Sequence, residues 1–251
     1  MLFRSDEDAY YSLLEKGAIN ISLDFSDNAV KRKGQKTFNS SLFNIKDFYM
    51  PYISLSTGIT DILTLGADIS YRITKANADI TLPQINRTIK ANKEISGLDL
   101  ITLWSTVGII KEHNSRPSIE FNSYFYLPNT GREEYQINNL GFFPELALHN
   151  TFSNYFDLYY AGGVSWDGSY AYPVYSFDVS PNYMISEMFS VSADFWNSFA
   201  KRSVPDNYFT FDISYNNPNN ISIDLYTGSK FQDPKKNLFG GITFNYYFYA
   251  F

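Results

Sequence analysis

Apolar and polar residues alternate one by one along much of this chain. Residues 63–71 read LTLGADISY, in which every second side chain is large or apolar. A period of two places successive side chains on opposite faces of a β-strand. The same alternation occurs in residues 19–25, 119–125, 189–195, 209–215, 221–225 and 242–248. Each of these stretches is therefore predicted to be a strand with one apolar and one polar face.

Less regular candidate strands fill the gaps between these stretches. They lie at residues 51–58, 98–109, 140–149, 156–166 and 174–183, which brings the predicted total to about twelve strands. The one candidate helix is residues 6–14, ahead of the first strand. No linker or shift in composition divides the chain, so a single β-domain is expected.

The connections between the predicted strands alternate in length. Short connections lie at residues 58–63, 111–117, 150–155, 185–188 and 216–220, and longer, more polar ones at 26–47, 72–97, 128–139, 167–173, 197–207 and 229–237. An even strand number with short turns at one end and long loops at the other is typical of bacterial outer-membrane barrels. The fold class predicted is all-β: a transmembrane antiparallel up-and-down β-barrel of about twelve strands, with short periplasmic turns and longer extracellular loops.

A soluble β-sandwich or jelly roll is the main alternative, because it is also built of alternating strands. Such a fold has no reason to sort its loops by length from one end to the other. Mean hydropathy is −0.25, and no window of 18 uncharged apolar residues exists, which excludes a bundle of membrane helices. The sorting of the loops favours the barrel.

Composition narrows the function classes. The chain has no cysteine, so it has no disulfide framework and no thiolate metal site. Its pI near 4.9 argues against nucleic acid as a partner. The first residues lack an apolar stretch of signal-peptide length. Either the protein is not exported or this is a processed or trimmed form with an added Met1, and the barrel pattern favours the second. The expected division is a periplasmic N-terminal segment, residues 1–16, and one barrel domain, residues 17–251, in the outer membrane and surrounded by its lipid.

The last predicted strand is rich in aromatic residues. Outer-membrane barrels typically end on such a strand, which the barrel-insertion machinery is thought to read. The predicted membrane-insertion signal consists of Ile242, Phe244, Tyr246, Phe248 and Phe251. Alternation favours Phe248 as the lipid-facing terminal ring.

If the apolar side chains face lipid, the polar ones face a lumen. The acids that alternate inward, predicted to determine selectivity, are Asp24, Asp68, Asp99, Glu120, Asp178, Asp194, Asp212 and Asp224. The one clear inward base within a strand is Arg72, which is expected near a strand end. A narrow acidic passage concentrates cations and repels anions. The alternative is a plugged barrel, in which Tyr124, Asn122, Ser192 and loop lysines bind these carboxylates in a hydrogen-bonded network.

Two loops carry further hypotheses. Residues 31–36, KRKGQK, form a basic cluster that is either a solvated loop or a contact with anionic surface glycolipid. The long connection at residues 72–97 includes the apolar run ITLPQI, and it is expected to fold into the barrel as a constriction.

An enzyme is the least favoured class. Nucleophilic catalysis on a histidine needs that histidine beside a serine and an orienting group. His113 lies in a predicted short turn and His149 closes a predicted strand at the same end, away from the outer end where barrel hydrolases work. No catalytic residue, cofactor or metal site is therefore predicted. The tyrosine-rich residues 166–175 could instead dock an outer-membrane protein partner.

Several stretches resemble one family of outer-membrane barrels, the transporter group named for the MetA pathway of phenol degradation. The resemblance rests on GITDILTLG at residues 58–66, SGLDL at 96–100, RPSIEFNSYFYLPNTG at 116–131 and MISEMFSVSADFW at 184–196. It covers about residues 48–248. It implies passive passage of small solutes, with hydrophobic or aromatic compounds as candidates, and it supplies no catalytic motif.

Overall fold

The computed structural model describes residues 12–33, 42–82, 87–113, 116–166, 172–201, 205–217, 219–231 and 238–250. These residues form strands and one short 3₁₀ helix, η2 (Glu133–Tyr135). The strands are β1 (Ala18–Lys33), β2 (Leu42–Thr60), β3 (Leu63–Leu82), β4 (Arg87–Leu98), β5 (Thr102–Ile110), β6 (Ser118–Tyr126), β7 (Gly141–Ser153), β8 (Phe156–Ser165), β9 (Val174–Ser186), β10 (Phe189–Ala200), β11 (Asp206–Asn217), β12 (Ile221–Lys230) and β13 (Leu238–Tyr249).

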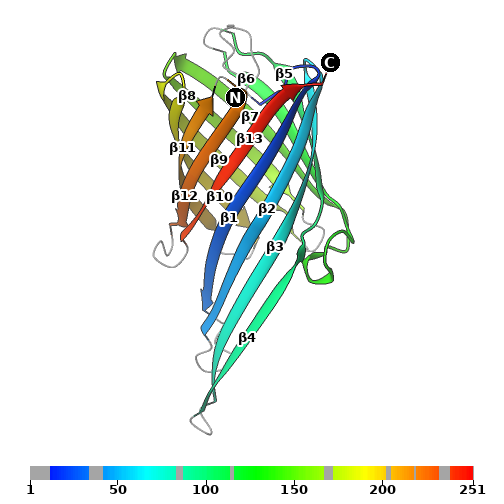
Figure 1. The fold of residues 1–251 in the computed structure, drawn as a ribbon, viewed down its shortest axis with the longest axis vertical. Coiled ribbons are helices and arrows are strands. Elements are labelled where there is room, and N and C mark those ends of the chain that lie inside the picture. The colour runs from blue at the N-terminus through cyan, green and yellow to red at the C-terminus, as the bar shows by residue number, and fades with distance from the viewer. Residues whose placement is uncertain are drawn as a thin grey trace.

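The sheet closes on itself into a barrel (Figure 1). Every neighbouring pair is antiparallel, and β1 joins the last strand, β13, with Ile19 opposite Phe248 and Phe25 opposite Ile242. Closure leaves no exposed sheet edge along the ring, which satisfies the backbone polar groups where no water is present. Twelve strands form the ring, because β4 pairs only with β3. The predicted fold class is confirmed.

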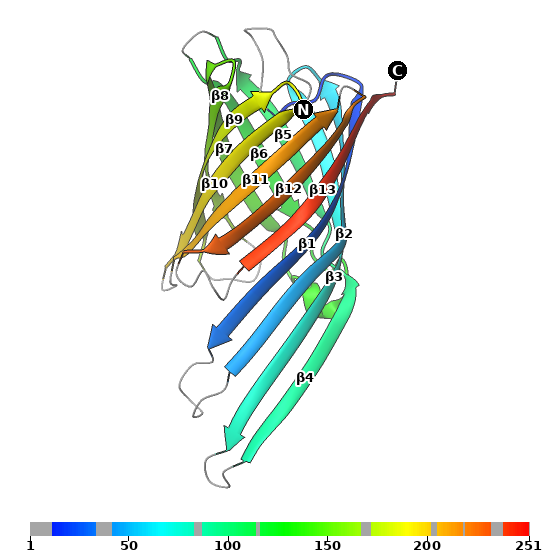
Figure 2. The same ribbon diagram turned by 60° about the vertical axis from the view of Figure 1, so that its left-hand side comes forward.

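Strand β3 changes its partner halfway along. Its residues 63–68 pair with β5, and its residues 71–82 pair with β4. Strands β4 and β5 thus follow one another along the same edge of β3, and the chain breaks the regular strand at residues 99–101. Strands β1 to β4 project far beyond the rim of the barrel (Figures 1 and 2).

Two expectations about long loops are therefore wrong. The connection at residues 72–97 forms a hairpin that points away from the barrel, so its backbone does not fold inward as a constriction. Residues 26–47 also belong largely to strands, because β1 runs to Lys33 and pairs there with Leu42 of β2. The structure does not describe the side chains of residues 80–85 or those of the basic cluster at residues 31–36. The candidate helix at residues 6–14 falls mostly outside the described residues, and its described end, residues 12–14, is not helical.

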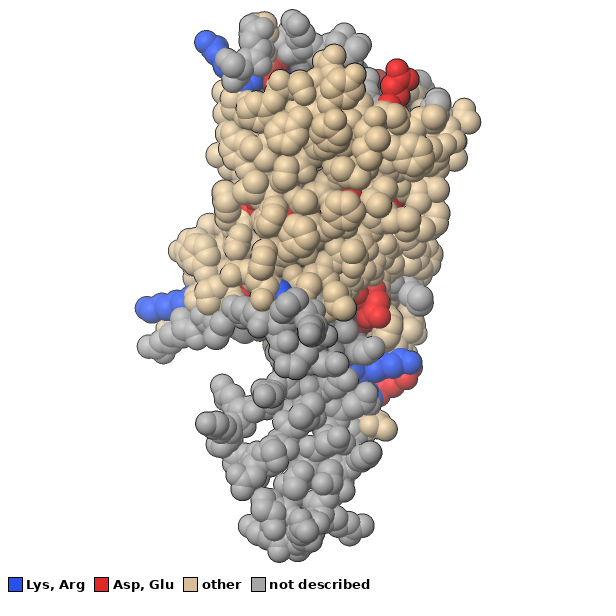
Figure 3. All heavy atoms as spheres, turned by 90° about the vertical axis from the view of Figure 1, so that its left-hand side faces the viewer, with Lys and Arg blue, Asp and Glu red and all other residues tan. Residues whose placement is uncertain are grey.

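The barrel is apolar on its outside and polar on its inside, which is the reverse of a soluble protein. Large apolar side chains such as Leu55, Phe177 and Leu225 are exposed, whereas the most buried side chains are those of Thr64, Ser118 and Glu120. In Figure 3 most charged side chains gather near the two ends of the barrel wall, and the band between them is almost free of charge at the surface. A wide apolar band of this kind matches the hydrocarbon layer of a membrane.

Glycines on the inner wall make room for aromatic rings. A Cβ on Gly163 would lie 2.3 Å from the Phe143 ring, and one on Gly66 would lie 2.2 Å from the Trp104 ring. Any side chain there would displace the ring, because real Cβ atoms do not approach so closely. These rings consequently lie flat against the wall instead of filling the lumen.

The described ends of the chain, residues 12 and 250, lie at the same end of the barrel (Figure 1). This is also the end of the short turns, such as residues 61–62 between β2 and β3 and residues 187–188 between β9 and β10. We call it the short-turn end, and the opposite end the outer end.

Candidate functional site

The inner wall is recognised from the strand register. Residues directly opposite each other on neighbouring strands face the same side of the sheet. Asp178 lies opposite Trp196, Trp196 opposite Tyr208, and Tyr208 opposite Lys230. The residue next to Asp178 in the chain, Phe177, points to the other side and is 48% exposed on the outside. The polar face of every such strand therefore lines a lumen.

Six carboxylates form a belt around this inner wall. The carboxylate belt consists of Asp24, Glu145, Asp178, Asp194, Asp212 and Asp224. Asp178 interacts electrostatically with Asp194 and Glu145, and Asp212 interacts with Asp194 and Asp224. Asp24 and Asp224 both lie opposite Thr243. The register thus brings together acids from six strands that the sequence placed separately.

Strand tilt explains how the belt stays level. Asp224 lies opposite Ser214, which is two residues from Asp212. Asp212 in turn lies opposite Ser192, two residues from Asp194. Strands in a closed barrel are tilted by about 35–45°, so a row perpendicular to the strands descends around the wall. Each acid lies two residues from the residue opposite the previous acid, and this shift offsets the descent, so the carboxylates stay at nearly the same height around the wall.

Neutral hydrogen-bond donors hold the belt. The Tyr226 hydroxyl and Thr243 Oγ1 donate to Asp24 Oδ2 at 2.9 and 2.8 Å. Asn245 Nδ2 donates to Asp224 at 2.9 Å, and Asn122 Nδ2 donates to Glu145 at 3.0 Å. Such donors orient the carboxylates without cancelling their charge. These hydrogen bonds therefore fix the orientation of the belt carboxylates on the inner wall.

Glu120 has a different environment, at the short-turn end. It is 2% exposed, and it accepts hydrogen bonds from the backbone N–H of Ser12, at 3.1 Å, and from the Ser12 hydroxyl. The N–H of Leu14 donates to Thr64 Oγ1 at 2.9 Å. The backbone of Lys16 forms an isolated β-bridge with that of Gly58. Residues 12–16, which we call the N-terminal strap, thereby cross from β6 to β3 and β2. The strap covers Glu120, so this acid does not belong to the open belt.

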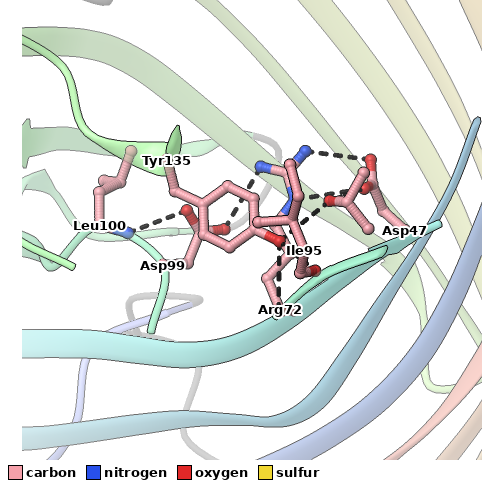
Figure 4. A network of polar contacts seen from close by, with 7 residues as sticks. Asp47, Arg72, Ile95, Asp99, Leu100 and Tyr135 are labelled. Carbon is pink, nitrogen blue, oxygen red and sulfur yellow. Dashed lines mark hydrogen bonds and ion pairs between the residues drawn. The ribbon is translucent and has the colours of Figure 1, made fainter. Parts of the chain in front are cut away.

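Arg72 and Asp99 meet at the outer end, in the network of Figure 4. Arg72 Nη2 lies 3.0 Å from Asp47 Oδ2, and Arg72 Nη1 lies 3.6 Å from Asp99 Oδ2. The Arg72 guanidinium also stacks 4.8 Å from the centre of the Tyr135 ring. Burial raises the pKa of the Asp99 carboxyl, although the Leu100 N–H bond and the Arg72 charge act in the opposite direction.

The same network fastens the β6–β7 connection to the projecting hairpin. The Tyr135 hydroxyl donates to the Ile95 carbonyl oxygen at 2.8 Å, and the Arg132 N–H donates to the Leu98 carbonyl oxygen at 2.8 Å. Gly131 has a φ of +75°, and a Cβ there would meet the Asp99 carbonyl oxygen at 2.4 Å. The loop is thus held against the break between β4 and β5.

The structure changes the setting of three sequence-predicted residues. Asp99 lies in the break at residues 99–101, outside any strand, and was wrongly placed in one. Arg72 lies in the middle of β3 instead of near a strand end, because β3 continues to Leu82. His149 does not close a strand, since β7 continues to Ser153. Its imidazole lies 3.2 Å from both Glu112 Oε2 and Asp157 Oδ1.

Sequence reasoning missed several lumen residues. Glu145 lies on the inner wall, and its alternation with Leu146 was the available signal. Lys230 was assigned to a loop, yet it lies opposite Tyr208 and forms an ion pair with Asp206 at 2.8 Å. Trp196 and Tyr208 have ring centres 5.3 Å apart on the inner wall. Their position next to Phe195 and Phe209, which belong to the apolar faces of the same strands, was the available signal.

The closing strand matches its predicted orientation in part. Phe244 and Tyr246 are 38% and 49% exposed on the outside, and the Tyr246 ring stacks 5.6 Å from that of Phe248. Ile242 and Phe248 are partly exposed, and Phe251 lies outside the described residues. The role of this strand as a membrane-insertion signal stays a prediction.

The described residues hold neither a metal-type cluster of side chains nor a membrane-spanning helix. No group of three or more His, Asp or Glu side chains there has the arrangement of a metal site. None of the helical residues described forms a helix long and apolar enough to cross a membrane.

A closed antiparallel barrel with an apolar exterior and a polar, carboxylate-lined interior defines an integral outer-membrane barrel protein. The chain belongs to the family described as "Putative MetA-pathway of phenol degradation", whose model matches residues 27–248. The predicted resemblance is thereby confirmed.

Solved structures share this fold at low sequence identity. The COG4313 outer membrane channel from Pseudomonas putida F1 is 12% identical, with a TM-score of 0.69 over 99% of this chain and 100% of that one. The transport unit of the autotransporter AIDA-I from Escherichia coli is 9% identical, with a TM-score of 0.58 over 94% and 91% of the two chains. The KdgM porin is 10% identical, with a TM-score of 0.53 over 91% and 99%. A comparison with curated protein sequences found no match.

Proposed function

We propose that this protein is a passive outer-membrane channel for small solutes and that its acidic lumen prefers cations. The observation that carries the proposal is the charge balance of the inner wall. The carboxylate belt is held by neutral donors, whereas the inward-facing cations Arg72 and Lys230 are each already ion-paired. Low-dielectric walls strengthen the resulting field, which attracts cations and repels anions.

Hydrophobic or aromatic solutes are the candidate cargo beyond simple ions. The family description refers to phenol degradation. The inner wall carries paired rings, Trp196 with Tyr208 and Tyr124 with Phe143, whose centres are 5.3 and 5.5 Å apart. Flat rings against the wall offer stacking surface without closing the passage.

Ion selectivity and permeation test this proposal. When refolded protein is measured in planar bilayers under a salt gradient, the sign of the reversal potential is expected to show a preference for cations. Changing Asp68, Asp194 and Asp212 together to Asn is expected to weaken that preference. Liposome swelling measures the passage of neutral and aromatic solutes. Anion preference of the unmodified protein contradicts the acidic-lumen proposal.

The second candidate is a structural or partner subunit with a plugged barrel. The N-terminal strap favours it, because Ser12 and Leu14 bind Glu120 and Thr64 at the short-turn end. A barrel of this kind would give no conductance and would co-purify with a stoichiometric outer-membrane partner. In either case residues 1–16 are proposed to lie on the periplasmic side and residues 17–251 to form the barrel.

Two further roles complete the proposal. The strand that ends with Ile242, Phe244, Tyr246, Phe248 and Phe251 is the segment that the barrel-insertion machinery would read. A hydrolase is disfavoured, because the similar solved structures named above are an outer-membrane channel, a porin and the transport unit of an autotransporter. If His149 were catalytic, the unmodified protein would hydrolyse a substrate and the His149→Ala variant would not.

A further inference from the structure

A cavity of about 390 Å³ opens on the inner wall toward the outer end. Its polar and aromatic lining includes Ser26, Tyr52, Asp68, Ser70, Thr102 and Tyr126, from β1, β2, β3, β5 and β6. The break between β4 and β5 adds Asp99 and Leu100 to the wall. Sites for small molecules typically have volumes of about 300–1,000 Å³. The cavity therefore has the size of a site for a small organic molecule.

Asp68 is the fixed negative charge of this cavity. Its Oδ1 accepts hydrogen bonds from Ser54 Oγ at 2.6 Å and from Trp104 Nε1 at 2.9 Å. The Tyr52 hydroxyl is a third hydrogen-bond partner. The side chain of Trp104 is itself held flat, because Gly66 leaves room for its ring. Three neutral partners orient the carboxylate, and the ion pairs described in this part of the chain do not include Asp68.

The positive charge nearby, that of Arg72, is already ion-paired. Arg72 forms ion pairs with both Asp47 and Asp99, at 3.0 and 3.6 Å. Asp24 lies opposite Tyr52 and is held by the neutral donors Tyr226 and Thr243. The cavity and its surroundings consequently carry an excess of negative charge that a bound cation would balance.

The rings complete the recognition surface. Tyr52 and Tyr126 line the cavity beside Asp68, and the Tyr126 ring packs where Gly141 has no side chain. Aromatic faces attract organic cations, because the face of the ring carries negative electrostatic potential. A ligand with a charged nitrogen and an apolar body would use both the carboxylate and the rings, whereas an inorganic ion or a neutral alcohol would use only part of the site.

We propose that this cavity is a binding site for small primary ammonium compounds, with the ammonium group at Asp68 and the apolar body against Tyr52 and Tyr126. The site names a solute class for the proposed channel and in that respect rests on the proposed function. Binding itself does not require an open pore, so the two proposals can be tested separately.

The test is equilibrium binding of benzylammonium to the full chain in detergent micelles, followed by saturation-transfer NMR and titration calorimetry. Benzyl alcohol serves as the neutral probe of nearly the same shape. Saturable binding of benzylammonium, with at least tenfold weaker binding of benzyl alcohol, is expected. Absence of saturable binding, or equal competition by benzyl alcohol, overturns the proposal.

Variants locate the site. Asp68→Asn is expected to raise the dissociation constant at least tenfold, and Tyr126→Leu at least threefold. The second variant keeps the test decisive if Asp68→Asn does not fold. Asp206→Asn removes one carboxylate from another part of the wall, beside Lys230, and is expected to change the dissociation constant less than twofold. Unchanged binding in Asp68→Asn and Tyr126→Leu overturns the assignment.

Conductance separates this site from the channel. Benzylammonium binding without measurable conductance refutes the proposed passage and leaves the site standing. Cation-selective conductance without benzylammonium binding refutes the site and leaves the channel standing.

Discussion

The Tyr135 hydroxyl donates a hydrogen bond of 2.8 Å to the carbonyl oxygen of Ile95, across 40 residues of sequence. This contact joins the β6–β7 connection to β4, where the projecting hairpin leaves the barrel. It also holds the ring on which the Arg72 guanidinium stacks. A single buried tyrosine therefore connects the outer loop to the ion pairs of Asp47 and Asp99.

Tyr135→Phe is expected to loosen this loop locally. Loss of one such hydrogen bond costs about 0.5–1.5 kcal/mol. Amide hydrogen exchange at Arg132, whose N–H binds the Leu98 carbonyl, is expected to become several-fold faster. Tyr155→Phe, at an exposed short turn, is the control and should leave this amide unchanged. Equal protection of Arg132 in both variants would contradict the role assigned to Tyr135.

Gly163→Ala and Gly162→Ala form a matched pair in β8. A Cβ on Gly163 would lie 2.3 Å from the Phe143 ring and 2.8 Å from the Pro144 carbonyl oxygen, whereas the nearest atom to one on Gly162 lies at 3.8 Å. Overpacking typically costs about 1–3 kcal/mol, so Gly163→Ala should lower the urea midpoint of unfolding from vesicles. Gly162→Ala should change stability by less than about 0.5 kcal/mol. Similar midpoints for the two variants would show that the ring does not lie against Gly163.

Phe211→Arg tests the outward face. Phe211 is 40% exposed on the apolar exterior and lies in the register between inward Thr210 and Asp212. An arginine on the lipid face of a barrel costs about 2–4 kcal/mol near the bilayer midplane. The folded fraction in lipid vesicles, measured by gel mobility without boiling, should fall sharply, while Phe211→Leu should fold as the unmodified protein does. A Phe211→Arg variant that folds equally well, or a protein that stays monomeric in buffer without detergent, would refute the lipid-facing assignment.

Glu120→Ala tests whether the N-terminal strap restricts the lumen. The substitution removes the acceptor of the Ser12 N–H and hydroxyl. If the strap narrows the passage, release of this end should raise single-channel conductance several-fold in planar bilayers. Glu94→Ala, on the exposed part of β4, is the control and should conduct as the unmodified protein does. Equal conductance in both variants would mean that the strap does not limit flow.

Much of the inner wall was predictable, because orientation in a strand depends only on parity. Asp194 and Asp212 alternate with Val191, Phe195 and Phe211, and each pair of neighbours must point to opposite faces. The same rule applied to Glu145 and Lys230, which were missed because the pattern around them is less regular. The loop at residues 72–97 was mispredicted because nothing in its local pattern shows that β4 pairs along the outer half of β3.

The amino-acid sequence by itself determined most strands of the ring, their two faces, the short turns, and the placement of acidic residues on the wet face. These properties follow from neighbours one or two positions apart, where steric and hydrophobic preferences act directly. Only the tertiary structure decided which acids meet in the belt, that Ser12 reaches Glu120, and that Arg72 lies between Asp47 and Asp99. The contacts of Ser12 and Arg72 join residues 25 to 108 positions apart, and all of these contacts exist because barrel closure imposes one register on the strands.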